Sequence, residues 1–93
     1  MALTRQFKDT VTARAERDPR FREALFAEAL NAYFSGDTTV GKAILRDLVN
    51  ATLGFEELAL TLTKPSKSLH RMLGPGGHPS TDNFFSILNA LQK

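Results

Sequence analysis

Residues 55–73 read FEELALTLTKPSKSLHRML, and this stretch decides the predicted fold. Pro65 divides it into two short segments, and in each segment apolar residues recur three or four positions apart, which is the spacing of one helix face. A small residue lies where two such helices would cross closely, and a phenylalanine at the start can anchor the pair in a core. Two short helices joined by a tight turn are typical of a helix-turn-helix. The residues expected to face inward are Phe55, Leu58, Ala59, Leu62, Leu69 and Met72.

The opposite face of the second helix is polar and cationic. Lysine and arginine pair with guanine edges or phosphates, and hydroxyl groups and N-terminal amides bind phosphate oxygens. The net charge is only +2, but no carboxylate occurs between Glu57 and Asp82. We therefore predict that this face binds DNA, the alternative being a solvated helix face without a ligand. The predicted DNA-binding residues are Lys64, Ser66, Lys67, Ser68, His70 and Arg71.

The turn between the two helices departs from the usual pattern at two positions. Thr63 stands where a glycine is common, because the backbone there tends to be left-handed and a β-branched residue is strained in that region. Lys64 stands where an apolar residue is normal. Either the turn takes another conformation or the motif is weakened. Pro65 suits the first turn of the helix that follows.

The rest of the chain also reads as helices separated by glycine, proline and capping residues, so we predict an all-α fold of five or six short helices. Asp18 and Pro19 form a start signal, and Gly36 is a stop signal. The Gly- and Pro-rich stretch 74–79 is expected to be a connector. The expected helices are Thr4–Arg17, Pro19–Phe34, Thr39–Leu53, Phe55–Thr61, Ser66–Leu73 and a last one that is capped by Ser80 or Thr81 and runs to about Leu91.

Two of these helices have informative apolar patterns. Pro19–Phe34 carries two apolar rows, which indicates either the central helix of the domain or a protein contact. Thr39–Leu53 carries one row, with Lys42 expected to face solvent. The predicted core face of that helix is Val40, Ala43, Ile44, Leu48 and Ala51.

A second basic cluster lies around the predicted helix start at Asp18 and Pro19. It consists of Arg14, Arg17, Arg20 and Arg22, mixed with acidic residues. Such mixing is typical of a solvated face with ion pairs, so we expect no nucleic-acid site there.

The composition excludes several classes of protein. The chain has 93 residues, enough for one domain, and its 42% hydrophobic and 24% charged residues are ordinary for a globular protein. It contains no cysteine, which excludes disulfides, thiol catalysis and cysteine-ligated zinc. The longest apolar run, Ala24–Ala27, is too short for a membrane span or a signal-peptide core. We therefore expect a cytoplasmic protein that does not contact membranes.

Patterns that resemble catalytic or metal sites are incomplete. Residues 36–43 nearly match a phosphate-binding loop, but Ala43 replaces the Ser or Thr that binds Mg²⁺. His70 and His78 are the only histidines, and neither has a carboxylate at helical spacing. The sequence shows no set of nucleophile, base and orienting group. We expect no enzymatic activity, no cofactor and no metal.

A family resemblance covers the chain from about residue 7 to residue 92. The segments that carry it are Gly36-Asp37, Val40–Asp47, Asn50–Thr52, Gly54–Ala59, Ser66–Gly74 and Gly77–Pro79. On these segments the chain resembles the bacterial addiction-module antidote family, which comprises small antitoxins with a lambda-repressor-like helix-turn-helix. That family commonly has glycine, an aliphatic residue and asparagine where this chain has Thr63, Lys64 and His78.

The resemblance implies both an architecture and a function. It implies a single domain with an N-terminal helix pair (residues 1–36) and a lambda-repressor-like core (residues 37–93). It also implies an antitoxin that neutralises a RelE-like toxin by direct binding and represses its own operon by binding operator DNA as a homodimer. The alternative is a protein–protein interaction module with weak or no DNA binding, which the departures at Thr63 and Lys64 favour.

Overall fold

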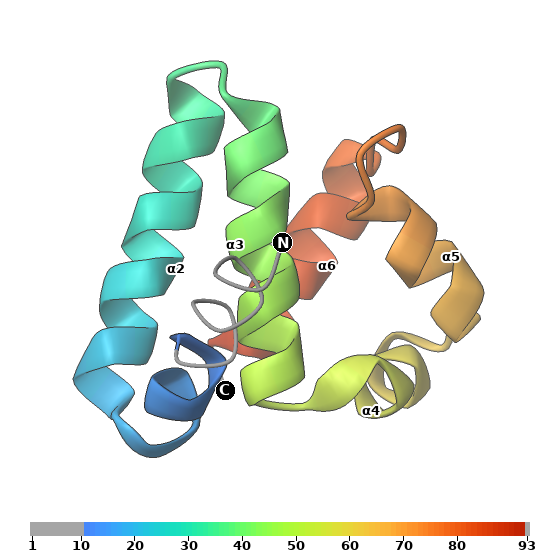
Figure 1. Cartoon of the computed structure of the whole chain (residues 1–93). Helices are drawn as coiled ribbons and strands as arrows, with labels where there is room; N and C mark the ends of the chain where they lie inside the picture. Colours follow the sequence, from blue (N-terminus) through green and yellow to red (C-terminus); the bar gives the residue numbers. More distant parts are fainter. Residues whose placement is uncertain (1–10, 93) are drawn as a thin grey trace, which may run out of the picture.

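In a computed structural model, which describes residues 11–92, every regular element is an α-helix (Figure 1). The all-α prediction is therefore confirmed for that range. Of the predicted helix Thr4–Arg17, residues 4–10 lie outside the described residues, and residues 11–17 are helical. No helix in the described part is both long and apolar enough to cross a membrane. The remaining helices are α2 (Pro19–Phe34), α3 (Thr38–Ala51), α4 (Gly54–Leu62), α5 (Ser66–Met72) and α6 (Thr81–Leu91).

Capping side chains fix where several helices begin. The carboxylate of Asp18 accepts hydrogen bonds from the amides of Arg20 and Phe21, so α2 begins at Pro19 as predicted. The hydroxyl of Ser80 accepts from the amide of Asn83 and starts α6. Local capping rules therefore predicted these two boundaries correctly.

The junction between α3 and α4 differs from the prediction. Helix α3 ends at Ala51, because the backbone of Thr52 leaves helical geometry with φ −114° and ψ −91°. The Thr52 hydroxyl donates to the Leu48 carbonyl at 2.6 Å. Gly54, which lies between the expected helices Thr39–Leu53 and Phe55–Thr61, is the first residue of α4 and has a φ of 77°. The two helices are thus separated by only two residues.

Helices α2 and α3 lie side by side and antiparallel, with α6 behind α3 and with α4 and α5 to one side (Figure 1). Helix α3 packs against both α2 and α4, and α4 packs against α5 and α6. The core therefore sits around α3 and α4. Its buried members are Ala29, Leu45, Leu48, Val49, Phe55, Leu58, Leu69, Leu73, Ile87, Leu88 and Ala90.

The predicted core face of α3 is partly wrong. Val40 is 46% exposed, whereas Leu45 and Val49 are fully buried. Lys42, which was expected to face solvent, is only 2% exposed. The reason is that α3 is covered on more than one side, so its buried surface is wider than the single stripe that periodicity assigns to a surface helix.

Helix α2 is not the central helix, although its two apolar rows made that one of the two expectations. Only Ala29 is buried on it, and Leu25, Phe26, Leu30 and Tyr33 pack partly buried against the core. Phe34 at its C-terminal end is 84% exposed. Helix α2 therefore covers α3 from one side.

Candidate nucleic-acid interface

The turn between α4 and α5 keeps the left-handed conformation that usually requires glycine. Thr63 has φ 56° and ψ 47°, and it is the only non-glycine residue with a positive φ among residues 11–92. The amide of Lys64 donates to the carbonyl of Ala59, and the amide of Thr63 donates to the carbonyl of Leu60. These two bonds form a Schellman motif, which ends α4 and reverses the chain. The departure at Thr63 therefore strains the turn without changing its geometry.

Helix α5 is anchored from its inner side. Pro65 is extended, with φ −64° and ψ 137°, and its carbonyl accepts hydrogen bonds from the amides of Ser68 and Leu69. Leu69 and Leu73 have no exposed surface, and Met72 packs partly buried against the core. The inward residues predicted on α4 are likewise in or against the core, with Phe55 7% exposed and Leu58 fully buried.

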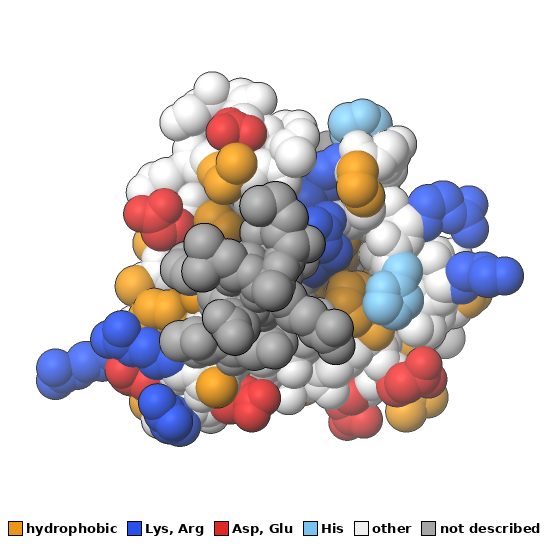
Figure 2. Space-filling model, viewed as in Figure 1, with side chains coloured by type: hydrophobic (Ala, Val, Ile, Leu, Met, Phe, Trp, Pro, Cys, Tyr) orange, Lys and Arg blue, Asp and Glu red, His pale blue; other side chains and the backbone are white. Residues whose placement is uncertain are grey.

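The predicted DNA-binding residues fall into two groups by exposure. Lys67, His70 and Arg71 are exposed, whereas Lys64, Ser66 and Ser68 are half-buried. In Figure 2, Lys and Arg side chains project at the right-hand edge, where Figure 1 places α5, and acidic side chains lie below them, over α4. Helix α5 thus presents a convex, cationic surface.

One predicted base-reading residue has an additional contact. The imidazole of His70 stacks on the ring of Phe55, with ring centroids 3.9 Å apart and an angle of 20° between the planes. Because Phe55 is at the start of α4, this contact ties the middle of α5 to the preceding helix. One face of the imidazole is covered, so His70 can offer only its edge and its other face to a ligand.

Two cations of α3 bind the end of α5 and the loop after it, and the sequence predicted neither contact. The guanidinium of Arg46 donates to the carbonyl of Leu73, which carries partial negative charge because it lies at the end of α5. The ammonium of Lys42 donates to the carbonyl of Gly77 in the loop, at 2.6 Å. The only sequence signal was weak: two cations four positions apart on a largely apolar helix.

The loop after α5 packs closely against the end of that helix at Gly77. A Cβ atom added there would lie 1.7 Å from the carbonyl oxygen of Arg71, whereas one added at Gly76 would meet nothing within 4 Å. The absence of a side chain at Gly77 therefore allows the loop to turn back against the end of α5. The connector predicted for residues 74–79 is a tightly fitted segment.

Comparisons with protein-family models, curated protein sequences and solved structures found no match. An exposed lysine and an exposed arginine on a short convex helix can bind phosphate groups and the edges of bases. The surface is not concave, which makes it unsuited to enclosing a small substrate.

The second basic cluster has local partners. Arg14 lies 3.8 Å from the Asp18 carboxylate, and its guanidinium sits 4.5 Å from the centroid of the Phe21 ring. Arg22 donates to the carbonyls of Ala15 and Glu16, at 2.7 and 3.1 Å, and so closes the helical segment 11–17. The contact between Arg14 and Asp18 is an ion pair of the expected kind, whereas Arg22 bonds to backbone carbonyls.

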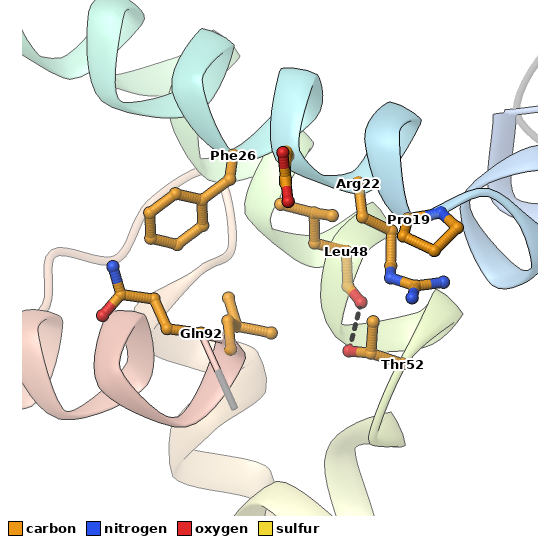
Figure 3. Close-up of a pocket in the computed structure, with 8 residues that line it drawn as sticks. Pro19, Arg22, Phe26, Leu48, Thr52 and Gln92 are labelled. Carbon is orange, nitrogen blue, oxygen red and sulfur yellow. Dashed lines mark hydrogen bonds between the residues drawn. The ribbon is translucent and has the colours of Figure 1, made fainter.

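A pocket of about 330 Å³ lies beside this cluster, between α2 and the ends of α3 and α6 (Figure 3). Phe26 and Gln92 border it on one side, and Pro19 and Arg22 on the other. Its ionisable residues are Arg22 and its neighbour Glu23, and the Arg22 guanidinium is already bonded to backbone carbonyls. The pocket therefore brings together no set of groups suited to acid–base or nucleophilic catalysis.

Proposed function

We propose that this protein binds double-stranded DNA through a helix-turn-helix formed by α4 and α5, within a lambda-repressor-like fold. The observation that carries the proposal is the placement of α5: Leu69 and Leu73 are buried, while Lys67 and Arg71 on the same helix are exposed. An α-helix with its side chains is about 10–12 Å in diameter, so the exposed side of α5 can enter a major groove about 12 Å wide.

The side chains divide into two roles in this proposal. Lys64, Lys67 and Arg71 contact phosphates and supply most of the affinity, so binding weakens as salt rises. Lys67, Ser68 and His70 contact base edges. Because His70 is stacked on Phe55, its edge is held in one direction, which favours a fixed contact over a mobile one.

The biological role that we propose is that of an antitoxin and autorepressor. It rests on the resemblance to addiction-module antidotes, whose members neutralise a RelE-like toxin and repress their own operon. A homodimer fits this role because one short helix reads too few base pairs, and two-fold symmetry doubles the site with half-sites about one helical turn apart. A neighbouring reading frame that encodes a basic protein of about one hundred residues would support this part of the proposal.

A second candidate function is a protein-interaction module with little or no DNA binding. The exposed apolar side chains favour it, since Phe34 is 84% exposed and Leu60 is 77% exposed. Single exposed apolar residues are common, so this observation weighs less than the placement of α5.

A gel-shift titration with the DNA upstream of the protein's own reading frame tests the first proposal. Lys67→Ala combined with Arg71→Ala should weaken binding about a hundredfold, because each dimer loses four cationic contacts. Arg17→Ala combined with Arg20→Ala is the matched control, since it removes the same charge from exposed positions away from α5. Equal affinity of the two double variants would contradict the assignment of α5, and failure of the unaltered protein to bind would favour the interaction module.

A further inference from the structure

The exposed side chains of α5 lie together on one face of the helix. They are Lys67, His70 and Arg71, at positions i, i+3 and i+4. Lysine and arginine carry hydrogen-bond donors and no acceptor, and an imidazole offers at least one N–H group. No residue of α5 is Asp, Glu, Asn or Gln. The exposed face of α5 is therefore made almost entirely of donors.

The two cations on this face are available to a ligand. Neither the Lys67 ammonium nor the Arg71 guanidinium forms a hydrogen bond or an ion pair with any described residue. By contrast, Lys42 and Arg46 of α3 are bonded to backbone carbonyls. The last carboxylate before α5 in the sequence is that of Glu57 on α4, and it pairs with neither cation of α5.

The imidazole on this face is held in place by its neighbour. His70 stacks on Phe55 with ring centroids 3.9 Å apart, and Phe55 is itself 7% exposed and belongs to the core. A ring packed in the core has few alternative positions, so it fixes the plane of the imidazole. The stack covers one face of His70 and leaves the edge, which carries the nitrogen atoms, for a ligand.

Among the four bases, guanine best matches a face made of donors. In the major groove guanine presents two acceptors, N7 and O6, and thymine presents one acceptor beside a methyl group. Adenine and cytosine present amino groups, whose usual partners are Asn, Gln, Asp and Glu, and α5 has none of these. Lys67 and His70 are three positions apart, a rise of about 4.5 Å, whereas successive base pairs are about 3.4 Å apart. The two side chains can therefore reach adjacent base pairs.

We propose that α5 reads two adjacent guanines in each half-site, and that Phe55 is the positioning residue for this readout. Lys67 donates to one guanine and His70 to the next, while Arg71 contacts a neighbouring phosphate. Ser68 is half-buried, and because its hydroxyl both donates and accepts, it can contact any base. The inference rests on the DNA binding proposed above and adds the base that is recognised.

Chemically modified DNA tests the preference for guanine. The probe is the duplex from upstream of the protein's own reading frame, in which the guanines of the footprinted site are replaced by 7-deazaguanine. This base lacks the N7 acceptor but still pairs with cytosine. In a gel-shift titration the modified duplex should bind at least about tenfold more weakly, because each site loses several acceptors. The matched control carries 7-deazaadenine in the same site and should bind within about twofold of the unmodified duplex.

The outcomes separate this inference from the proposed function. If the unaltered protein does not bind the unmodified duplex, the DNA-binding proposal fails and this inference fails with it. If the protein binds but the footprinted site has no adjacent guanines, only this inference is overturned. The same holds if 7-deazaguanine weakens binding no more than 7-deazaadenine does.

Variants of the two histidines test the readout by His70. His70→Ala should lower the preference for the upstream duplex over an unrelated duplex at least about fivefold, the effect of one lost hydrogen bond. His78→Ala is the matched control, because it removes the other histidine from the exposed loop after α5, and it should leave the preference unchanged. Equal preference in these two variants would overturn the assignment of His70.

A core variant tests the positioning role of Phe55. Phe55→Leu keeps an apolar side chain in the core but removes the ring that stacks on His70. The preference for the upstream duplex should fall as it does in His70→Ala, while affinity for the unrelated duplex stays within about twofold. Equal weakening on both duplexes would show that Phe55 supports only the fold. If Phe55→Leu does not fold, the two histidine variants decide.

Discussion

Replacing Gly77 by alanine tests how tightly the loop after α5 is fitted. The new Cβ would lie 1.7 Å from the Arg71 carbonyl oxygen, so the loop must move by about 1.5 Å to reach an ordinary contact of about 3.3 Å. The carbonyl of Gly77 moves with the loop. If the carbonyl moves away from Lys42 by this distance, the 2.6 Å hydrogen bond from the Lys42 ammonium is lost.

The size of the effect follows from these two losses. Forcing an extra carbon into a packed site costs about 1–3 kcal/mol, and losing a hydrogen bond to a charged group costs about 1.5–3 kcal/mol. We therefore expect Gly77→Ala to lower the free energy of unfolding by about 3–5 kcal/mol. For a chain of 93 residues, this corresponds to a decrease in Tm of about 15–25 °C.

Urea denaturation followed by circular dichroism at about 222 nm measures the change through its helical signal. Gly76→Ala is the matched control, because a Cβ there meets nothing within 4 Å, and it should stay within about 0.5 kcal/mol of the unaltered protein. If Gly77→Ala also stays within about 1 kcal/mol of that control, the loop is not held as described.

Three further predictions follow from other contacts. Thr63→Gly should stabilise the protein by about 1 kcal/mol, because relief of the left-handed strain exceeds the entropy that glycine adds to the unfolded chain. Thr61→Gly, inside α4, should instead destabilise it, and chemical denaturation of both variants tests this difference in sign. The pKa of Tyr33 should lie above 10, because burial of its phenol outweighs the nearby Arg46 guanidinium, and as Tyr33 is the only tyrosine, tyrosinate absorbance reports it alone. Because the folded state favours the neutral phenol, its contribution to the free energy of unfolding is present below about pH 10 and is lost as pH rises through the folded pKa. Tyr33→Phe has no phenol to ionise, so an equal loss of stability with pH in this variant and in the unaltered protein would contradict the account. Lys42→Met should cost about 1–3 kcal/mol in thermal or urea denaturation, since it leaves the Gly77 carbonyl without its donor, and a neutral result would show that the buried ammonium is not needed.

The features that the sequence predicted are those set by neighbouring residues. Asp18 and Pro19 start α2 through contacts within three positions, and the inward faces of α4 and α5 follow from apolar spacing around Leu58 and Leu69. Local rules were sufficient there because each short helix has one apolar face. At Thr63 the sequence left open whether the turn takes another conformation, and the structure has the left-handed backbone that is usual for the motif.

The features that the sequence did not predict depend on distant parts of the chain. Lys42 is buried because Gly77, 35 positions away, supplies its acceptor, and no local pattern contains that information. Leu45 and Val49 were left out of the predicted core face of α3 for the same reason, since packing on several sides buries more than the single stripe of a surface helix. The contact between the rings of Tyr33 and Phe84 likewise forms only when two parts of the chain that are far apart in sequence come together.

The central claim is that α5 is the surface that meets DNA. An NMR titration of the ¹⁵N-labelled protein with the duplex from upstream of its own gene tests it most directly. We predict the largest amide shifts in residues 63–71 and no shifts in the arginine cluster around Arg14 and Arg22. Shifts centred on that cluster, with residues 63–71 unchanged, would contradict the claim.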